Sequence, residues 1–179
     1  GETAAARAVV QIEAHPGYNP RSNIGPNNIR YDVALLRLEK PIPTHELDPF
    51  VLHQSIVSSG PVSVVSYGRA RESLPSRQDV CQVLGQQEGV LITSCTVDFG
   101  SSGAPIFSFT GGRAKIVSVV SAKAEIDGKK VSLGTDLDAP LKHLKAELDR
   151  QEGHVPVASR VGIGDGRGSS GAKFVKPED

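Results

Sequence analysis

The stretch DFGSSGAP, at positions 98–105, places two serines between two glycines. Glycines beside a serine suggest a bent backbone that presents one hydroxyl to a ligand, because glycine adopts the left-handed conformations that tight turns require. A serine hydroxyl is a poor nucleophile unless a general base takes its proton. Taken alone, the pattern is more typical of an ordinary loop before a strand, so its chemical interpretation depends on the rest of the chain.

Asp32 is the second candidate for chemistry. It stands immediately before the apolar run VALLRL at 33–38. A carboxylate in such a position is partly desolvated unless it is paired or hydrogen-bonded. By itself Asp32 fits a turn or a strand end, whereas together with the serine turn it indicates a catalytic pair.

Composition argues against several other classes of function. The 179 residues carry 20 basic and 20 acidic side chains, so no net field attracts nucleic acid or an anionic membrane. No apolar run approaches the roughly 20 residues that cross a bilayer, and no signal peptide stands at the start. The histidines are not spaced around the cysteines as in a zinc site. We therefore expect a soluble protein without metal or cofactor that binds neither nucleic acid nor a membrane.

Two cysteines, Cys81 and Cys95, lie 95 − 81 = 14 positions apart. They are either a disulfide that ties neighbouring loops or two buried free thiols, and we favour the disulfide. A disulfide implies an oxidising compartment. The expected location is therefore outside the cell or in a periplasm.

Short strands are predicted to position these residues. The runs are rich in Val and Ile and are bounded by Gly, Pro, Asn and Ser, which indicates an antiparallel barrel or sandwich. One helix is predicted after Pro140, because Leu141, Leu144 and Leu148 form a single apolar stripe. The predicted strands are 8–14, 33–38, 62–67, 80–84, 90–95, 105–109, 116–122 and 131–133.

The composition changes beyond residue 150, and 151–179 is predicted to be a glycine-rich tail. The run GIGDGRG in this tail superficially resembles a phosphate-binding loop. It neither follows a clear strand nor opens a helix, so we predict no nucleotide site there.

Five segments, in order, resemble one family. HPGYNP at 15–20 and YDVALLRLEKPI at 31–42 look like the region around the catalytic aspartate of chymotrypsin-like serine proteases. VSVVSYG at 62–68 is similar to the opening strand of their second barrel, and GSSGAP at 100–105 to their nucleophile loop. IVSVV at 116–120 resembles the strand that walls their primary specificity pocket.

The resemblance implies an all-β, chymotrypsin-like double antiparallel β-barrel with a C-terminal helix. Residues 1–55 would be the remaining part of the first barrel and the crossover. Residues 56–150 would form a largely complete second barrel with the helix, and 151–179 the tail. The implied activity is that of a serine endopeptidase, with a polypeptide as substrate.

The resemblance also assigns roles to residues. Ser102 matches the nucleophile, and the backbone N–H groups of Gly100 and Ser102 would form an oxyanion hole. Asp32 matches the carboxylate that orients the catalytic histidine. Ser118 falls where the family has a serine near that aspartate, and the backbone of 118–120 would pair with a bound peptide as an added strand.

Specificity is assigned by the same resemblance. Thr96 stands six positions before the nucleophile, where trypsin-like members carry a carboxylate that selects Lys or Arg. Asp98 is nearer the serine and is expected at the pocket rim. Val119 and Val120 would narrow the pocket, so small or medium uncharged side chains are expected in the substrate.

The sequence departs from the family pattern at two places. Ser101 replaces the aspartate that receives the new N-terminus after zymogen cleavage, as in bacterial glutamyl-endopeptidase-like members. The histidine motif before Asp32 is also missing, and His15 lies in a segment that does not supply the base. Because the chain starts at Gly1 and contains no methionine, we expect an N-terminal segment or separate chain of the same protease to supply the histidine. This chain alone is then expected to be inactive.

Two alternatives remain. An α/β-hydrolase would also use a Gly-x-Ser-x-Gly turn, with Asp136 or Asp138 and His143 following the serine, but it requires a helix after the turn. A protease-like module that binds protein without catalysis agrees with the missing histidine. The retention of both Ser102 and Asp32 favours the enzyme.

Overall fold

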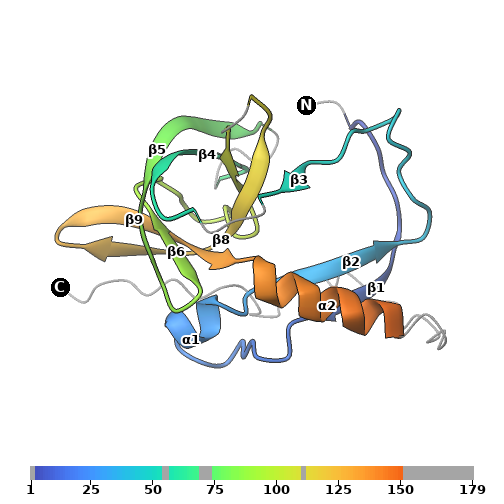
Figure 1. The fold of residues 1–179 in the computed structure, drawn as a ribbon, viewed down its shortest axis with the longest axis horizontal. Coiled ribbons are helices and arrows are strands. Elements are labelled where there is room, and N and C mark those ends of the chain that lie inside the picture. The colour runs from blue at the N-terminus through green and yellow to red at the C-terminus, as the bar shows by residue number, and fades with distance from the viewer. Residues whose placement is uncertain (1–2, 54–56, 69–73, 110–111, 151–179) are drawn as a thin grey trace.

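The computed structural model describes residues 3–53, 57–68, 74–109 and 112–150, which form two sheets and two helices (Figure 1). Strands β1 (Val9–Ala14) and β2 (Ala34–Leu38) pair as an antiparallel two-stranded sheet. The second sheet has seven strands: β3 (Val51–Leu52), β4 (Gly60–Ser66), β5 (Ser76–Gln87), β6 (Val90–Thr93), β7 (Pro105–Ser108), β8 (Lys115–Ile126) and β9 (Lys129–Asp136).

The larger sheet closes into a barrel. Its strand order is β3-β8-β7-β4-β5-β6-β9, and β8 also pairs with β9. Six strands thus form a closed antiparallel barrel, while β3 adds to β8 in the parallel direction. The mostly-β architecture of a closed barrel, a second sheet and a C-terminal helix confirms the fold class predicted from the sequence.

The predicted strands all form, but their lengths differ from the expectation. β5 and β8 extend well beyond the apolar runs because pairing with neighbouring strands continues through polar residues that carry no hydrophobic signal. Two short elements were not predicted: the helix α1 (Pro26–Ile29) and strand β3. The predicted helix is α2 (Asp138–Arg150), with Leu141, Leu144 and Leu148 buried. The predicted tail, 151–179, lies outside the described residues.

The barrel interior combines an apolar cluster with small hydrogen-bonded side chains. Val62, Ile106 and Val120 belong to the apolar cluster. Thr93 and Ser132, both fully buried, share a hydroxyl–hydroxyl hydrogen bond of 2.6 Å. The predicted disulfide is confirmed: Cys81 of β5 is bonded to Cys95, just after β6, with their Cα atoms 5.0 Å apart.

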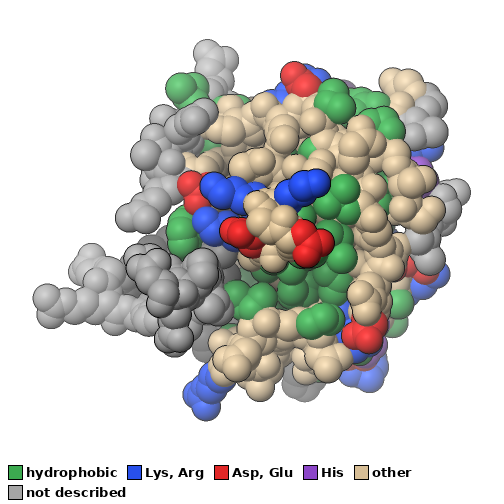
Figure 2. Space-filling model, turned by 90° about the vertical axis from the view of Figure 1, so that its left-hand side faces the viewer, with side chains coloured by type: hydrophobic (Ala, Val, Ile, Leu, Met, Phe, Trp, Pro, Cys, Tyr) green, Lys and Arg blue, Asp and Glu red, His purple; other side chains and the backbone are tan. Residues whose placement is uncertain are grey.

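The β8–β9 hairpin projects from one side of the barrel, and Figure 2 views the molecule from that side. Basic and acidic side chains lie together at the centre of this view. The exposed tip carries Glu125, Asp127, Lys129 and Lys130, so no surface of one sign forms there. Neither α1 nor α2, the helices of the described ranges, is long and apolar enough to cross a membrane.

The small sheet is covered on one face by α2, which packs against both of its strands. The guanidinium of Arg37 donates a hydrogen bond to the Leu148 carbonyl, at 3.0 Å. The other face carries exposed apolar side chains, with Ile12 61% and Leu36 55% exposed at paired positions. We call this surface, made by Val10, Ile12, Ala14, Ala34 and Leu36, the open apolar face.

Candidate active site

The serine turn lies between β6 and β7. Gly100 and Gly103 have φ angles of 89° and 79°, in the left-handed region that favours glycine. Between them Ser101 is buried and Ser102 is exposed. The turn therefore presents the Ser102 side chain to solvent, as the sequence pattern suggested.

Backbone hydrogen bonds join this turn to β8. The Gly103 N–H donates to the Val120 carbonyl at 2.7 Å, and the Val120 N–H donates to the Ala104 carbonyl at 2.9 Å. The position of Ser102 is thus fixed relative to the middle of β8.

Asp32 lies just after α1 and also contacts β8. The Ser121 hydroxyl donates to Oδ2 of Asp32 at 2.6 Å. Thr135 Oγ1 donates to the Ile29 carbonyl at 2.7 Å and has a longer contact, 3.2 Å, with the Asp32 carbonyl. Burial raises the pKa of Asp32, and the hydrogen bond from Ser121 acts in the opposite direction. Burial raises the pKa of Tyr18, and the negative charge of Asp32 adds to this rise.

One strand therefore brings the two candidates together. Val120 bonds to the serine turn and the next residue, Ser121, bonds to Asp32. Asp32 and Ser102 are 102 − 32 = 70 positions apart in the sequence, and β8 holds both at neighbouring points.

The serine beside Asp32 is Ser121 and not Ser118, which corrects the sequence-based assignment. Ser118 donates instead to the Thr135 carbonyl, at 2.8 Å, inside the barrel. Both serines occur in the run SVVS, and only strand pairing decides which one reaches Asp32. A register shift between Val120 and Ala122 further changes which side chains point outward there.

The residues predicted to line a specificity pocket lie in different environments, from the exposed surface to the barrel core. Thr96 is exposed, and its N–H donates to the Gln78 side chain at 2.7 Å. Val119 is partly buried and pairs with Thr135 across β9. Val120 is 3% exposed and belongs to the barrel core. Asp98 is exposed beside the serine turn.

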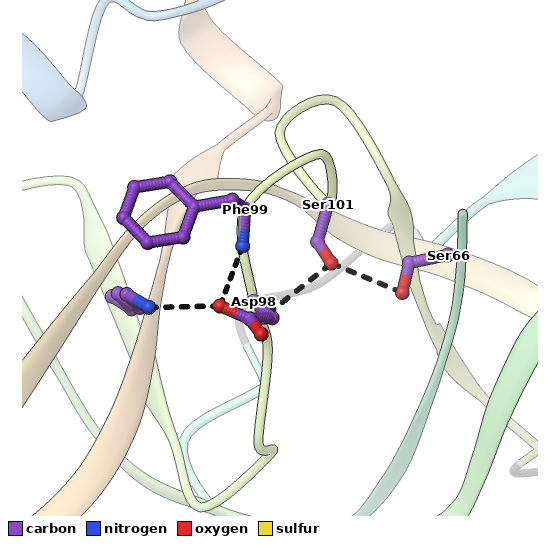
Figure 3. A network of polar contacts seen from close by, with 5 residues as sticks. Ser66, Asp98, Phe99 and Ser101 are labelled. Carbon is purple, nitrogen blue, oxygen red and sulfur yellow. Dashed lines mark hydrogen bonds and ion pairs between the residues drawn. The ribbon is translucent and has the colours of Figure 1, made fainter. Parts of the chain in front are cut away.

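Asp98 takes part in a network that sequence reasoning missed (Figure 3). Its Oδ1 atom accepts from the Phe99 N–H at 2.8 Å and pairs with Nζ of Lys123 at 3.0 Å. The same ammonium lies 4.1 Å from the centre of the Phe99 ring. Lys123 lies on β8, two positions after Ser121, and nothing in the sequence joins it to residue 98.

The histidines do not complete a catalytic triad within the described residues. His15 stacks on Tyr31 with ring centres 4.5 Å apart, and its Nδ1 accepts from the Gly17 N–H. Burial and the nearby His143 lower the pKa of His15. In the described ranges no histidine hydrogen-bonds to Asp32 or Ser102, and no group of three His, Cys, Asp or Glu side chains could hold a metal ion.

The geometry agrees with a comparison to known families. A family model described as a trypsin-like peptidase domain matches residues 2–114. The matched region includes both Asp32 and the serine turn, and it ends just before β8 begins. No curated protein matches the chain significantly.

Proposed function

Because the chain belongs to the family of trypsin-like peptidase domains, whose function is proteolytic, we propose that it is the nucleophile-bearing chain of a serine endopeptidase. In this proposal Ser102 attacks the peptide carbonyl and forms the acyl-enzyme. Asp32 orients the histidine that takes the Ser102 proton. The proposal rests chiefly on the role of β8, which bonds to the serine turn at Val120 and to Asp32 at Ser121.

The backbone of the serine turn suits charge stabilisation. Gly100 has a positive φ, a conformation that glycine adopts readily, and its N–H is proposed to point toward the side of the loop that bears the Ser102 side chain. Two N–H donors, from Gly100 and Ser102, would then face the developing oxyanion. Such preorganised donors contribute several kcal/mol, on the order of 3 each, to transition-state stabilisation.

The base is proposed to come from a partner that covers the open apolar face. This partner is an N-terminal segment or a separate chain of the same protease, and it carries the catalytic histidine. Two observations support it: the open apolar face belongs to the sheet whose strand β2 begins two positions after Asp32, and exposed apolar surface of this kind favours association. Because Asp32 lies so close to β2 in the chain, a partner on this face is proposed to reach the Asp32 carboxylate as well.

The substrate is proposed to be a polypeptide that pairs with β8 beyond Ser121. The expected pairing segment 118–120 is already hydrogen-bonded to β7 or the serine turn on one side and to β9 on the other. The segment proposed here is therefore 121–123, beyond the last residue of β8 that pairs with β7. Asp98 is the acidic residue nearest the serine turn, but Lys123 already balances its charge. A buried Lys or Arg of the substrate would therefore meet no free carboxylate there, so we expect uncharged side chains rather than a trypsin-like preference.

One observation favours a second candidate, a protease-like binding module without catalysis. In the described residues Asp32 has Ser121 as its side-chain partner, and no histidine joins them. In both proposals the disulfide favours an oxidising location, which is either extracellular or periplasmic.

Chemical rescue distinguishes the two candidates. The full chain is treated with a fluorophosphonate probe, with and without added imidazole, and labelled sites are mapped by mass spectrometry. If only the base is missing, imidazole should accelerate labelling at Ser102 far more than at an exposed control such as Ser22. Ser102→Ala should abolish this signal, and Asp32→Ala should reduce it. Equal labelling at Ser102 and Ser22 would favour the binding module.

A further inference from the structure

The serine turn is organised around a buried hydroxyl that the proposed reaction does not use. Ser101 is 2% exposed and lies between the two residues proposed as oxyanion donors. Its N–H donates to the Asp98 carbonyl at 3.0 Å, and its carbonyl accepts from the Ala104 N–H at 3.0 Å. The shape of the turn therefore depends on where Ser101 sits.

The side chain of Ser101 connects the turn to the barrel wall. Its hydroxyl accepts from the Asp98 N–H at 3.4 Å and donates to Oγ of Ser66 at 3.1 Å. Ser66 is the last residue of β4 and is 8% exposed. Figure 3 shows the Ser101 side chain directed at Ser66, on the side of the turn away from the Phe99 ring.

This contact is neutral and buried, so neither salt nor a new chain terminus is needed to form it. A hydroxyl pair of this kind is present as soon as the barrel has folded. By contrast, the pair between Lys123 and Asp98 is ionic and is exposed on the Asp98 side. Such pairs are screened by salt and contribute little at a surface.

We propose that Ser66 is a positioning residue, which holds Ser101 and thereby keeps the N–H groups of Gly100 and Ser102 oriented without an ionic contact or an activating cleavage. The catalytic consequence of this role depends on the proposed function of Ser102. The loop geometry it predicts can be measured independently of any activity.

The test is amide hydrogen exchange in the full chain, resolved at Ser101, Gly103 and Ala104. Their N–H groups are hydrogen-bonded within or from the turn. Ser66→Ala should accelerate exchange at these amides roughly two- to tenfold relative to those of β7, the range expected for loss of one neutral hydrogen bond. Ser66→Thr, which keeps the hydroxyl, should restore the protection.

Ser63→Ala is the matched control. Ser63 is a fully buried serine of the same strand, but it donates to the Gln78 carbonyl, at 2.8 Å, and not to the turn. Equal exchange of the turn in the Ser63 and Ser66 variants would overturn the proposal. If Ser66→Ala does not fold, Ser101→Ala removes this bond together with the longer one from the Asp98 N–H. Unchanged exchange of the turn in that variant would overturn the proposal.

Salt and labelling give two further readouts. Protection of the turn should persist in about 1 M salt and in Lys123→Gln. A loss of protection in both would assign the positioning role to Lys123 and overturn the proposal for Ser66.

Imidazole-assisted labelling of Ser102 should fall in Ser66→Ala and stay unchanged in Ser63→Ala. Should Ser102 never label in the natural sequence, the proposed function fails while the exchange experiment still decides the role of Ser66.

Discussion

The barrel and the two-stranded sheet both contain apolar strand residues, but these residues are buried in the barrel and exposed on one face of the small sheet. Both contain strands with runs of Val, Ile and Leu. In the barrel, Ile106 is fully buried and every strand from β4 to β9 has neighbours on both sides. In the small sheet, Ile12 and Leu36 are paired with each other and more than half exposed.

In the two-stranded sheet, the face that packs against the rest of the protein is the less apolar one. From Val10 to Ala14 of β1 and from Ala34 to Arg37 of β2, half-buried positions alternate with exposed apolar ones; the half-buried positions are Gln11, Glu13, Leu35 and Arg37. Leu38, at the end of β2, is also half-buried. Because successive side chains of a strand point to opposite faces, the mostly polar face is the more covered one. An exposed apolar face favours association with another segment or chain. This arrangement supports the proposal that a histidine-bearing segment binds the open apolar face.

The largest expected effect tests the comparison directly. Ile106→Ala should lower the free energy of unfolding by about 2–5 kcal/mol, because it leaves a cavity in the barrel core. Ile12→Ala should change it by less than about 0.5 kcal/mol, as is usual at exposed positions. Urea unfolding followed by circular dichroism measures both. Similar losses in the two variants would mean that the open apolar face is covered in the isolated chain.

A smaller effect is expected from the disulfide, which lies wholly in the barrel. The double variant Cys81→Ala, Cys95→Ala should lose about 3 kcal/mol, since the bond closes a loop of about 15 residues. Hydrogen exchange should then rise at β5 and β6 before it rises at β1. A variant as stable as the natural chain would show that the bond contributes nothing to the barrel.

The smallest effect concerns Asp32, which lies where the two regions meet. Burial raises its pKa above the ordinary value of 3.8, so the folded chain binds this proton more tightly than the unfolded chain does. The contribution of Asp32 to stability is therefore greatest below pH 3.8 and is lost as pH rises through the raised pKa. We expect Asp32→Asn to increase stability slightly at pH 7.

The same measurement at about pH 3, below both pKa values, should show no gain from Asp32→Asn. The exposed hairpin residue Asp127 offers a control, because Asp127→Asn should change stability little at either pH. A stability loss in Asp32→Asn at neutral pH would show that the ionised carboxylate has a stabilising partner in the isolated chain.

The sequence by itself determined the class of the fold and the positions of most strands along the chain. Alternating Val and Ile between turn residues specifies strands locally, and the leucines after Pro140 specify the helix, because these signals depend only on neighbours along the chain. The glycines around Ser102 likewise predicted the turn, and the cysteine pair was correctly predicted to be bonded.

Only the tertiary structure decided which residues meet. The sequence does not distinguish Ser118 from Ser121 as the partner of Asp32. The strand register of β8 places Ser121 in hydrogen-bond contact with the Asp32 carboxylate. The links from Lys123 to Asp98 and from Ser66 to Ser101 span 25 and 35 positions. Such contacts arise from closure of the barrel, which places distant segments side by side, and no periodicity along the chain records them.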